Sequence, residues 1–256
     1  MLLVLDIGNT NTVVGVYEDA KLLADWRLAT DRLKTVDEYG ILVKSLFSEA
    51  GLDHRRVESA IISSVVPPVT GLFAGMIEKY FGVRPREVGP GVKTGLVIKY
   101  ENPREVGADR VVNAVAGIQL YGPPLVIIDF GTATTFCAIG AQGDYLGGSI
   151  APGLGIISEA LFIRTAKLPR VEIVRPRTVI GKNTVNSIQS GLFFGYIGMV
   201  ESLITRIKAE MNCNPLVVAT GGLAELIAGD TKMIDRINPY LTLEGLRLIY
   251  GMNQNA

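Results

Sequence analysis

Near its start the chain reads Leu2-Leu3-Val4-Leu5-Asp6-Ile7-Gly8-Asn9-Thr10, an apolar run that ends at an aspartate and is followed by glycine and short polar residues. β-Branched residues dominate the next stretch, from Thr12 to Tyr17. Two apolar runs joined by a short turn that contains glycine are typical of a β-hairpin. We therefore predict strands over residues 2–6 and 12–17, connected by a turn at residues 8–11.

The rest of the first half extends this hairpin into a layered α/β unit. A third strand is expected over residues 21–30, and apolar residues at helical spacing predict a helix over residues 37–51. Another β-branched run predicts a strand over residues 59–66, which Pro67-Pro68 ends. Helices are expected over residues 69–80 and 106–120. Between them, the Gly- and Pro-rich residues 85–100 are expected to cross the surface.

The second half repeats this plan. Strands are predicted over residues 124–130, 134–139 and 145–150, and a later strand over residues 216–220 leads into Gly221-Gly222 and a helix over residues 224–228. The stretch Asp129-Phe130-Gly131-Thr132-Ala133 has an aspartate at a strand end and a glycine two residues later, as Asp6 and Gly8 do. Two similar lobes are the economical explanation.

An Asp-x-Gly turn after a buried strand has a definite chemical use. Glycine permits a tight turn that leaves backbone N–H groups and hydroxyls open to an anion such as phosphate. The aspartate does not bind phosphate itself but holds a hydrated Mg²⁺ that does. A single copy of this pattern is also compatible with an ordinary polar hairpin turn. Two copies at the starts of two matching units favour a clamp for a triphosphate.

Composition excludes several classes of protein. Hydrophobic residues make up 48% of the 256 residues, and 25 basic residues balance 25 acidic ones. No basic run builds a patch for nucleic acid, and charged residues interrupt every apolar stretch before the ~20 residues that a membrane span requires. The first residues lack the basic leader of a signal peptide. Two cysteines are too few for a disulfide framework. We expect a soluble cytoplasmic protein, without nucleic acid or a membrane as partner.

Other common catalytic patterns are missing. His54 is the single histidine, so a Ser-His-Asp triad has little support. Gly181-Lys182-Asn183-Thr184 lacks the earlier glycine of a P-loop, and residues 153–158 lack the third glycine of a dinucleotide fingerprint. We interpret residues 153–158 as a loop. A general base is therefore expected to be a carboxylate, and Asp109, at the start of a predicted helix, is the candidate. A capping role at that helix end explains Asp109 equally well.

Taken in order, Asp6 to Thr10, Gly107-Ala108-Asp109-Arg110, Asp129 to Thr135 and Thr220-Gly221-Gly222 resemble the motifs of type III pantothenate kinases. The likeness spans nearly the whole chain. That family is grouped with acetate kinases, sugar kinases and actin. The resemblance implies two duplicated ribonuclease-H-like (actin-like) lobes, residues 1–117 and 118–256. Each lobe would be a mixed sheet flanked by helices, with the active site in the cleft between them.

The resemblance also implies roles for individual residues. Asp109 would be the proton acceptor, Asp6 would hold Mg²⁺ through water, and Asp129 would bind a monovalent cation, K⁺ or NH₄⁺. Thr220 to Gly222 would lie near the adenosine, and an apolar, Gly-rich helix expected over residues 187–204 would supply the interface of a homodimer. The positions expected to bind ATP are Asp6, Ile7, Gly8, Asn9, Thr10, Asn11, Thr12, Val13 and Thr132. Those expected to bind pantothenate are Tyr100, Gly107, Ala108, Asp109, Arg110 and Thr184.

The activity implied is ATP-dependent phosphorylation of pantothenate to 4'-phosphopantothenate, the first step of coenzyme A biosynthesis. Two alternatives stay open at this point. One is a nucleotide-binding transcriptional accessory protein, since the fold also serves proteins that are not enzymes. The other is a kinase that acts on another small acid or a sugar, because phosphate-binding turns do not by themselves select the acceptor.

Overall fold

The computed structural model describes residues 1–254, and the chain forms two compact units. The first unit comprises residues 1–96, 101–119 and 240–254. The second comprises residues 97–100 and 120–239. Both are α/β units built around a five-stranded mixed sheet, which confirms the expected fold class.

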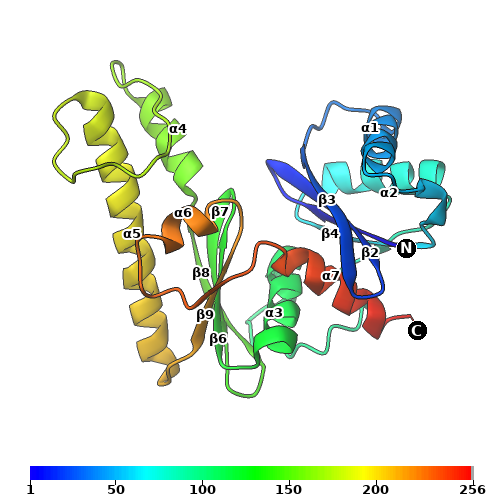
Figure 1. Ribbon diagram of the computed structural model, residues 1–256. Helices are drawn as coiled ribbons and strands as arrows, with labels where there is room; N and C mark the ends of the chain where they lie inside the picture. The colour runs from blue at the N-terminus through cyan, green and yellow to red at the C-terminus, as the bar shows by residue number, and fades with distance from the viewer. Residues whose placement is uncertain (255–256) are drawn as a thin grey trace. The chain divides into compact units, whose positions relative to one another are not determined.

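The first unit follows the predicted order of elements (Figure 1). In its sheet, β1 lies between the antiparallel strand β2 and the parallel strand β4, in the order β3-β2-β1-β4-β5. The elements are β1 (Leu2–Ile7), β2 (Asn11–Glu18), β3 (Lys21–Ala29), α1 (Val36–Glu49), β4 (Ser59–Ser64), α2 (Pro67–Phe81), β5 (Arg86–Glu87), α3 (Ala108–Tyr121) and α7 (Leu241–Met252), with short 3-10 turns at His54–Arg56 and Pro103–Glu105.

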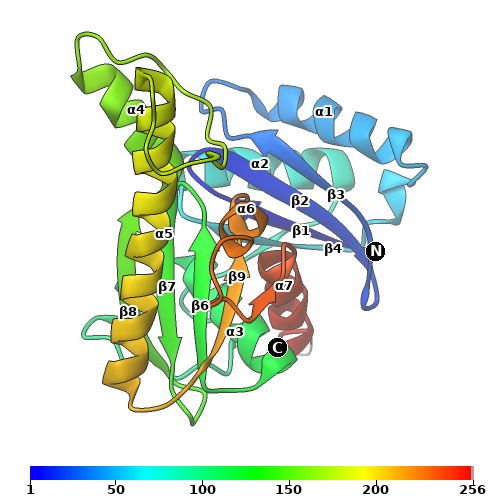
Figure 2. The same cartoon turned by 60° about the vertical axis from the view of Figure 1, so that its left-hand side comes forward.

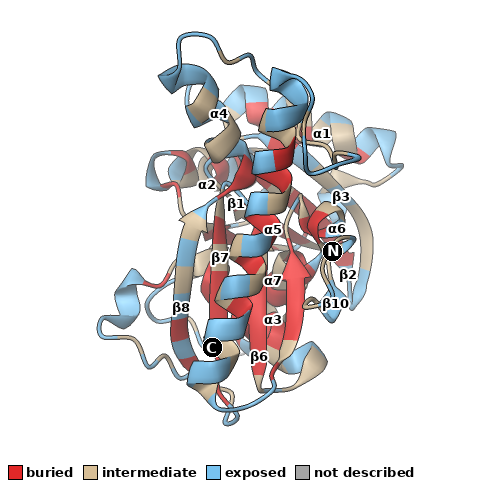
Figure 3. Ribbon diagram, turned by 90° about the vertical axis from the view of Figure 1, so that its left-hand side faces the viewer, coloured by how far each residue is buried: buried red, intermediate tan, exposed pale blue. Residues whose placement is uncertain are grey.

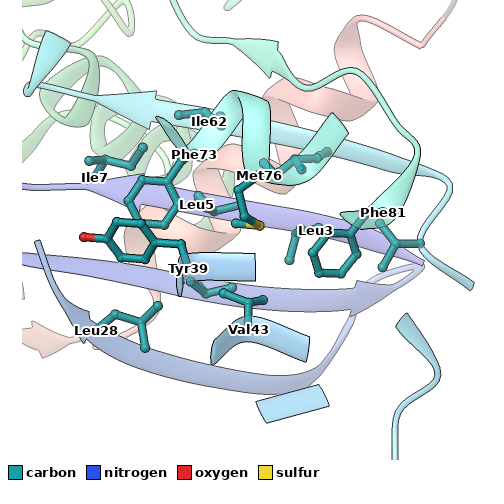
Figure 4. Close-up of a cluster of buried hydrophobic side chains, with 14 of the residues drawn as sticks. Leu3, Leu5, Ile7, Leu28, Tyr39, Val43, Ile62, Phe73, Met76 and Phe81 are labelled. Atoms are coloured by element: carbon teal, nitrogen blue, oxygen red, sulfur yellow. The ribbon is translucent and has the colours of Figure 1, made fainter. Parts of the chain in front are cut away.

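Strand β1 is buried on both faces, as its continuous apolar run predicts. Alternate residues of a strand point to opposite faces. Leu3 and Leu5 pack with α1 and α2, against side chains such as Tyr39 and Phe73 (Figure 4). Val4 points the other way and packs with α3 and α7. Figure 2 shows α1 and α2 along one face of this sheet. The strand end at Asp6 is thereby held by two separate cores.

The second unit has the same topology. Its sheet order, β10-β9-β6-β7-β8, matches that of the first unit strand for strand, with β6 in the place of β1. Strand β6 pairs antiparallel with β7 and parallel with β9. The internal duplication is therefore confirmed. The elements are β6 (Leu125–Phe130), β7 (Ala133–Ile139), β8 (Tyr145–Pro152), α4 (Leu154–Arg164), α5 (Thr184–Met211), β9 (Leu216–Thr220), α6 (Ala224–Ala228) and β10 (Arg236–Ile237).

Some local predictions differ from the structure. The interpretation of residues 153–158 as a loop was wrong, because α4 begins at Leu154 immediately after β8. Helix α2 begins at Pro67 rather than at Val69, since proline fits the first turn of a helix, where its missing N–H would have no partner. Helix α5 spans 28 residues and extends beyond the expected 187–204 on both sides.

The composition of the units also differs from the expected lobes, 1–117 and 118–256. Helix α7 packs on the first sheet, where Leu243, Leu246 and Ile249 contact the cluster around Val4. The chain thus returns to the first unit after completing the second. Residues 97–100, by contrast, belong to the second unit, although the residues on both sides of them lie in the first.

Candidate active site

The first Asp-x-Gly turn connects β1 to β2 as a tight hairpin. The N–H of Gly8 donates to the carbonyl oxygen of Asn11 at 3.0 Å. The carbonyl of Thr10 accepts from the N–H of Thr30 at 2.9 Å, which ties the turn to the end of β3. Asp6 is partly exposed at the strand end, and Asn9 to Asn11 are exposed. The turn therefore presents short polar side chains and backbone to solvent.

Not every residue of the stretch from Asp6 to Val13 is open to a ligand through its side chain. Ile7 is fully buried in the core beneath α1 and α2. Thr12 is also fully buried, and its hydroxyl hydrogen-bonds that of Thr30 at 2.9 Å. Val13 is half-buried on β2, opposite Asp6. Any contact that Ile7 or Thr12 makes with a nucleotide would be through the backbone.

The Gly107 to Arg110 motif lies at the same end of the first sheet as this turn. Val65, just after β4, donates its N–H to the carbonyl of Ile7 at 3.1 Å. A Cβ added to Gly107 would lie 3.6 Å from Val65 Cγ1 and 2.5 Å from Asp109 Oδ1. A Cβ at residue 107 would therefore take the place that the Asp109 carboxylate occupies, and the carboxylate would have to shift. Val65 connects the end of β1 to the first turn of α3.

Asp109 lies in that first turn and accepts a hydrogen bond from the N–H of Arg110 at 2.8 Å. Burial raises the pKa of the Asp109 carboxyl above its usual value, and the bond from the Arg110 N–H and the Arg110 charge oppose that rise without cancelling it. The Arg110 side chain itself is 5% exposed. A carboxylate with raised pKa beside a buried guanidinium is an arrangement common in functional sites.

The second turn has the same design. Asp129, near the end of β6, is paired with Thr135 on β7 and with Thr220 on β9. Gly221 adopts φ +91°, and a Cβ there would lie 2.6 Å from Asp129 Oδ1. The Thr220 to Gly222 motif therefore lies directly against the carboxylate of Asp129. On the other side, the carbonyl of Thr132 accepts from the N–H of Gly153 at 3.1 Å.

Tyr100 and Thr184 also lie in the second unit but not at its turn. The Tyr100 ring stacks edge-on against Tyr145, with ring centroids 6.4 Å apart, and lies beside Gly147. Gly147 is six residues before Gly153, so Tyr100 is well along β8 from the turn. Thr184 begins α5 and lines a groove of about 810 Å³ between α4 and α5.

Sequence reasoning did not single out several residues that surround these positions. Tyr196 lines the groove next to Thr184, and its hydroxyl hydrogen-bonds that of Thr134, beside the second turn. Lys182, which the sequence offered only as part of an incomplete P-loop pattern, lines the same groove. Lys99 forms an ion pair with Asp144, just before the Tyr145 that supports Tyr100. Lys99 could have been noticed because it is next to Tyr100 in the sequence. Nothing in the sequence linked Lys99 to the carboxylate of Asp144, 45 residues later.

The expected cation ligands, Asp6 and Asp129, are in different units. Within residues 1–254, no three side chains of His, Cys, Asp or Glu are grouped as ligands for a metal ion. Magnesium is commonly held by one or two carboxylates together with substrate phosphates and water, so a single strand-end aspartate fits that mode. Across the same residues, no helix has the length and apolar character needed to cross a membrane.

Solved structures with a similar fold include two from different functional classes. One, described as a Baf family transcriptional activator from Campylobacter jejuni, covers 99% of this chain and 100% of its own, with a TM-score of 0.63 and 17% identity. The other is an inorganic polyphosphate/ATP-glucomannokinase from Arthrobacter sp. strain KM, which covers 99% of both chains with a TM-score of 0.51 and 11% identity. At these identities the likeness concerns the fold alone.

Sequence comparison is more specific. A family model described as type III pantothenate kinase matches residues 2–206. A type III pantothenate kinase of Geobacter sulfurreducens is 56% identical over 254 residues, which are 99% of this chain and 100% of the relative. Another from Bacillus cytotoxicus is 56% identical over 253 residues, 99% of this chain and 97% of the relative. The chain belongs to the type III pantothenate kinase family.

Proposed function

We propose that this protein transfers the γ-phosphoryl group of ATP to the primary hydroxyl of pantothenate, giving 4'-phosphopantothenate and ADP. This is the first step of coenzyme A biosynthesis, and cytoplasmic ATP would supply it. The observation that carries the proposal is the motif at the start of α3. There, the partly buried Asp109, with its raised pKa, is next to the buried Arg110, at the sheet end that also holds the first turn. The names of the relatives at 56% identity support the choice of substrate.

Asp109 acts as the general base in this proposal. Its carboxylate accepts the proton of the pantothenate hydroxyl while the hydroxyl oxygen forms a bond to the γ-phosphorus, and the bond from that phosphorus to the β,γ-bridging oxygen breaks to release ADP. A raised pKa favours this role, because it brings the carboxylate closer to the proton affinity that the transfer requires. The bond from the Arg110 N–H to Asp109 Oδ1 fixes the carboxylate in one orientation.

Arg110 and Tyr100 are assigned to acceptor binding, with Thr184 from the groove in the second unit. The planar fork of N–H donors on the buried Arg110 guanidinium matches a carboxylate such as that of pantothenate. Gly107 and Ala108 contribute backbone at the same turn. Asp6 to Val13 and Thr132 are assigned to ATP, with Ile7 and Thr12 limited to backbone contacts because their side chains are buried.

Two cations accompany ATP in the proposal. Mg²⁺ would be held through water by Asp6, the partly exposed carboxylate at the end of β1, and when bound it would neutralise charge on the phosphates. A monovalent cation, K⁺ or NH₄⁺, would bind Asp129. The glycines around Asp129 support this assignment, because a Cβ on Gly221 or Gly131 would lie 2.6 Å or 3.5 Å from Asp129 Oδ1 and would fill the space beside the carboxylate.

The proposal includes a homodimer formed by the second units. Much of one side of helix α5 is exposed (Figure 3). Gly191, Gly195 and Gly198 of this helix are exposed, and a Cβ added to any of them would meet nothing within 4 Å. Large apolar side chains of the second unit are also exposed: Ile150, Ile156, Phe162, Ile163, Val179, Ile180 and Val185. Exposed apolar surface of this kind marks protein interfaces. A molar mass of about twice 27.5 kDa by light scattering is expected, and a monomer at micromolar concentration would contradict the dimer.

The test of the activity is a direct assay of the purified protein. With ATP, Mg²⁺, K⁺ and pantothenate we expect stoichiometric ADP and 4'-phosphopantothenate, and little ADP when a sugar or another small acid replaces pantothenate. Arg110→Ala is expected to raise the KM for pantothenate far more than that for ATP. Nucleotide binding without turnover of any acceptor would favour an accessory protein and contradict the proposal.

A further inference from the structure

Residues 97–100 belong to the second unit, although the chain on both sides of them belongs to the first unit. They add a short segment to the edge of the second sheet. The N–H of Tyr145 donates to the carbonyl of Val97, and the N–H of Lys99 donates to the carbonyl of Tyr145, both at 2.8 Å. Ile98 thereby pairs in parallel with Tyr145 at the start of β8. These bonds extend the second sheet by one short edge segment. Tyr100, the last residue of the segment, is consequently fixed to the second unit.

An ion pair strengthens this attachment one residue before Tyr100. Lys99 Nζ lies 2.5 Å from Asp144 Oδ2, and the Asp144 side chain is 8% exposed, whereas that of Lys99 is 60% exposed. Burying a carboxylate is costly unless a charged partner compensates it. The Lys99 ammonium group keeps the pKa of the Asp144 carboxyl below its usual value. The ion pair therefore depends on the backbone hydrogen bonds that hold Lys99 beside Asp144.

The turn that precedes Tyr145 is shaped around this carboxylate. A Cβ on Gly140 would lie 2.5 Å from Asp144 Oδ1, and the N–H of Gly140 donates to the carbonyl of Asp144 at 2.8 Å. Gly143, in the same turn, adopts φ +77°. The position of Asp144 is therefore fixed by the hairpin between β7 and β8 rather than by the ion pair alone.

The support beneath the Tyr100 ring is rigid. Tyr145 is fully buried, and its hydroxyl donates to Cys137 Sγ at 3.6 Å. Gly147, at φ +132°, lies beside the ring, since a Cβ there would be in ordinary van der Waals contact with Tyr100 Cε2, at 3.6 Å. Tyr100 itself is only half-buried. Its ring packs against Tyr145 and lies beside Gly147 on β8.

We propose that Lys99, Asp144 and Tyr145 are positioning residues for acceptor binding, which hold the Tyr100 ring in the orientation that receives pantothenate. This inference rests on the proposed function, in which Tyr100 binds pantothenate. The three residues affect the binding of the acceptor and not the binding of ATP, since none of them belongs to the turns assigned to ATP. Loss of the ion pair removes one of the bonds that hold residues 97–100 to β8, so the Tyr100 ring is held less firmly and acceptor binding weakens without a change in the chemical step.

The test is a split between the kinetic constants in the full-length enzyme. Lys99→Met and Asp144→Asn are each expected to raise the KM for pantothenate about 2- to 5-fold, as the loss of a partly exposed ion pair allows. The kcat and the KM for ATP should stay unchanged. Lys99→Arg keeps the pair and is expected to restore the wild-type KM. The double variant should resemble either single variant, because both remove one interaction.

The controls separate this inference from the proposed function. Lys93→Met removes an exposed lysine six residues earlier and should leave every constant unchanged. Tyr100→Ala should raise the KM for pantothenate at least as much as Lys99→Met does. If Tyr100→Ala raises it and the Lys99 and Asp144 variants do not, the positioning role is refuted and the proposed function stands. If Tyr100→Ala has no effect, both the role of Tyr100 and the positioning role are refuted. Additive effects in the double variant, or an equal rise in the KM for ATP, would also overturn the positioning role.

Discussion

At the scale of single residues, Asp109 combines two demands that oppose each other. As a base it must be ionised, yet burial raises its pKa and so disfavours the charge. Asp109→Asn keeps an oxygen that can accept the bond from the Arg110 N–H but removes the base. We expect kcat to fall by roughly 10²- to 10⁴-fold with the dissociation constant for ATP unchanged. Single-turnover kinetics and ATP titration measure the two quantities, and near-normal turnover would rule out Asp109 as the base.

The same substitution has a second, pH-dependent consequence at this residue. A carboxyl whose pKa is raised on folding stabilises the protein most below its unfolded pKa, and this contribution is lost as pH rises through the folded pKa. We therefore expect Asp109→Asn to be at least as stable as the wild type at pH 7. Its advantage over the wild type in the free energy of unfolding should disappear as pH falls from the folded pKa of Asp109 to the unfolded pKa. Thermal unfolding at a series of pH values measures this difference.

Asp53 provides a control of opposite sign for this pH series. Hydrogen bonds from Arg55 lower the pKa of its carboxyl to about 2, so its contribution is present above the unfolded pKa and is lost as pH falls through about 2. Asp53→Asn should therefore be slightly less stable than the wild type at pH 7, with the difference closing in acid. Parallel pH dependence in the two variants would contradict the assignment of burial as the cause at Asp109.

At the scale of elements, the sequence predicted the strands and helices whose pattern of apolar residues is long enough to show a period. The buried strands β1 and β6 and the helices α1 and α3 were predicted because apolar runs and helical spacing persist over several residues. Strands β5 and β10 have only two residues each and carry no period at all. Helix α4 was missed because its glycines, Gly153 and Gly155, are typical of loops, although here one of them is the N-cap.

The element formed by β6, its turn and the end of β9 gives a further prediction. Gly221→Ala adds a Cβ at φ +91°, 2.6 Å from Asp129 Oδ1 and 2.7 Å from the backbone of Phe130. We expect a loss of about 1 to 3 kcal/mol in the free energy of unfolding from this strain. Displacement of the carboxylate should raise the K⁺ concentration for half-maximal activity. Gly71→Ala, in open space on α2, is the control and should add at most ~1 kcal/mol of stability. Identical K⁺ dependence in wild type and Gly221→Ala would contradict the role of Asp129.

At the scale of the whole molecule, the duplication was predictable and the composition of the units was not. Two matching Asp-x-Gly turns predicted two sheets of equal topology, which the strand orders confirm. The return of α7 to the first unit left no local signal, because an apolar helix face fits either sheet equally well in sequence. The same holds for residues 97–100, whose hydrogen bonds to Tyr145 join segments far apart in the chain. The motifs proposed to form the site can be picked out in the sequence, whereas the residues proposed to position Tyr100 became visible only in the fold.

Helix α7 is part of the core of the first unit, so a substitution there tests whether the two units unfold independently. Leu246 is fully buried among Val4, Val112 and Ile249 of the first unit. We expect Leu246→Ala to cost about 2 to 5 kcal/mol, because it leaves a cavity under the first sheet. Met252→Ala, at the half-exposed end of the same helix, should cost far less. Amide hydrogen exchange should then show lost protection in β1, β2 and β4 of the Leu246 variant, with β6, β7 and β9 unchanged. Equal loss of protection in both sheets would mean that the two units unfold as one, despite their separate cores.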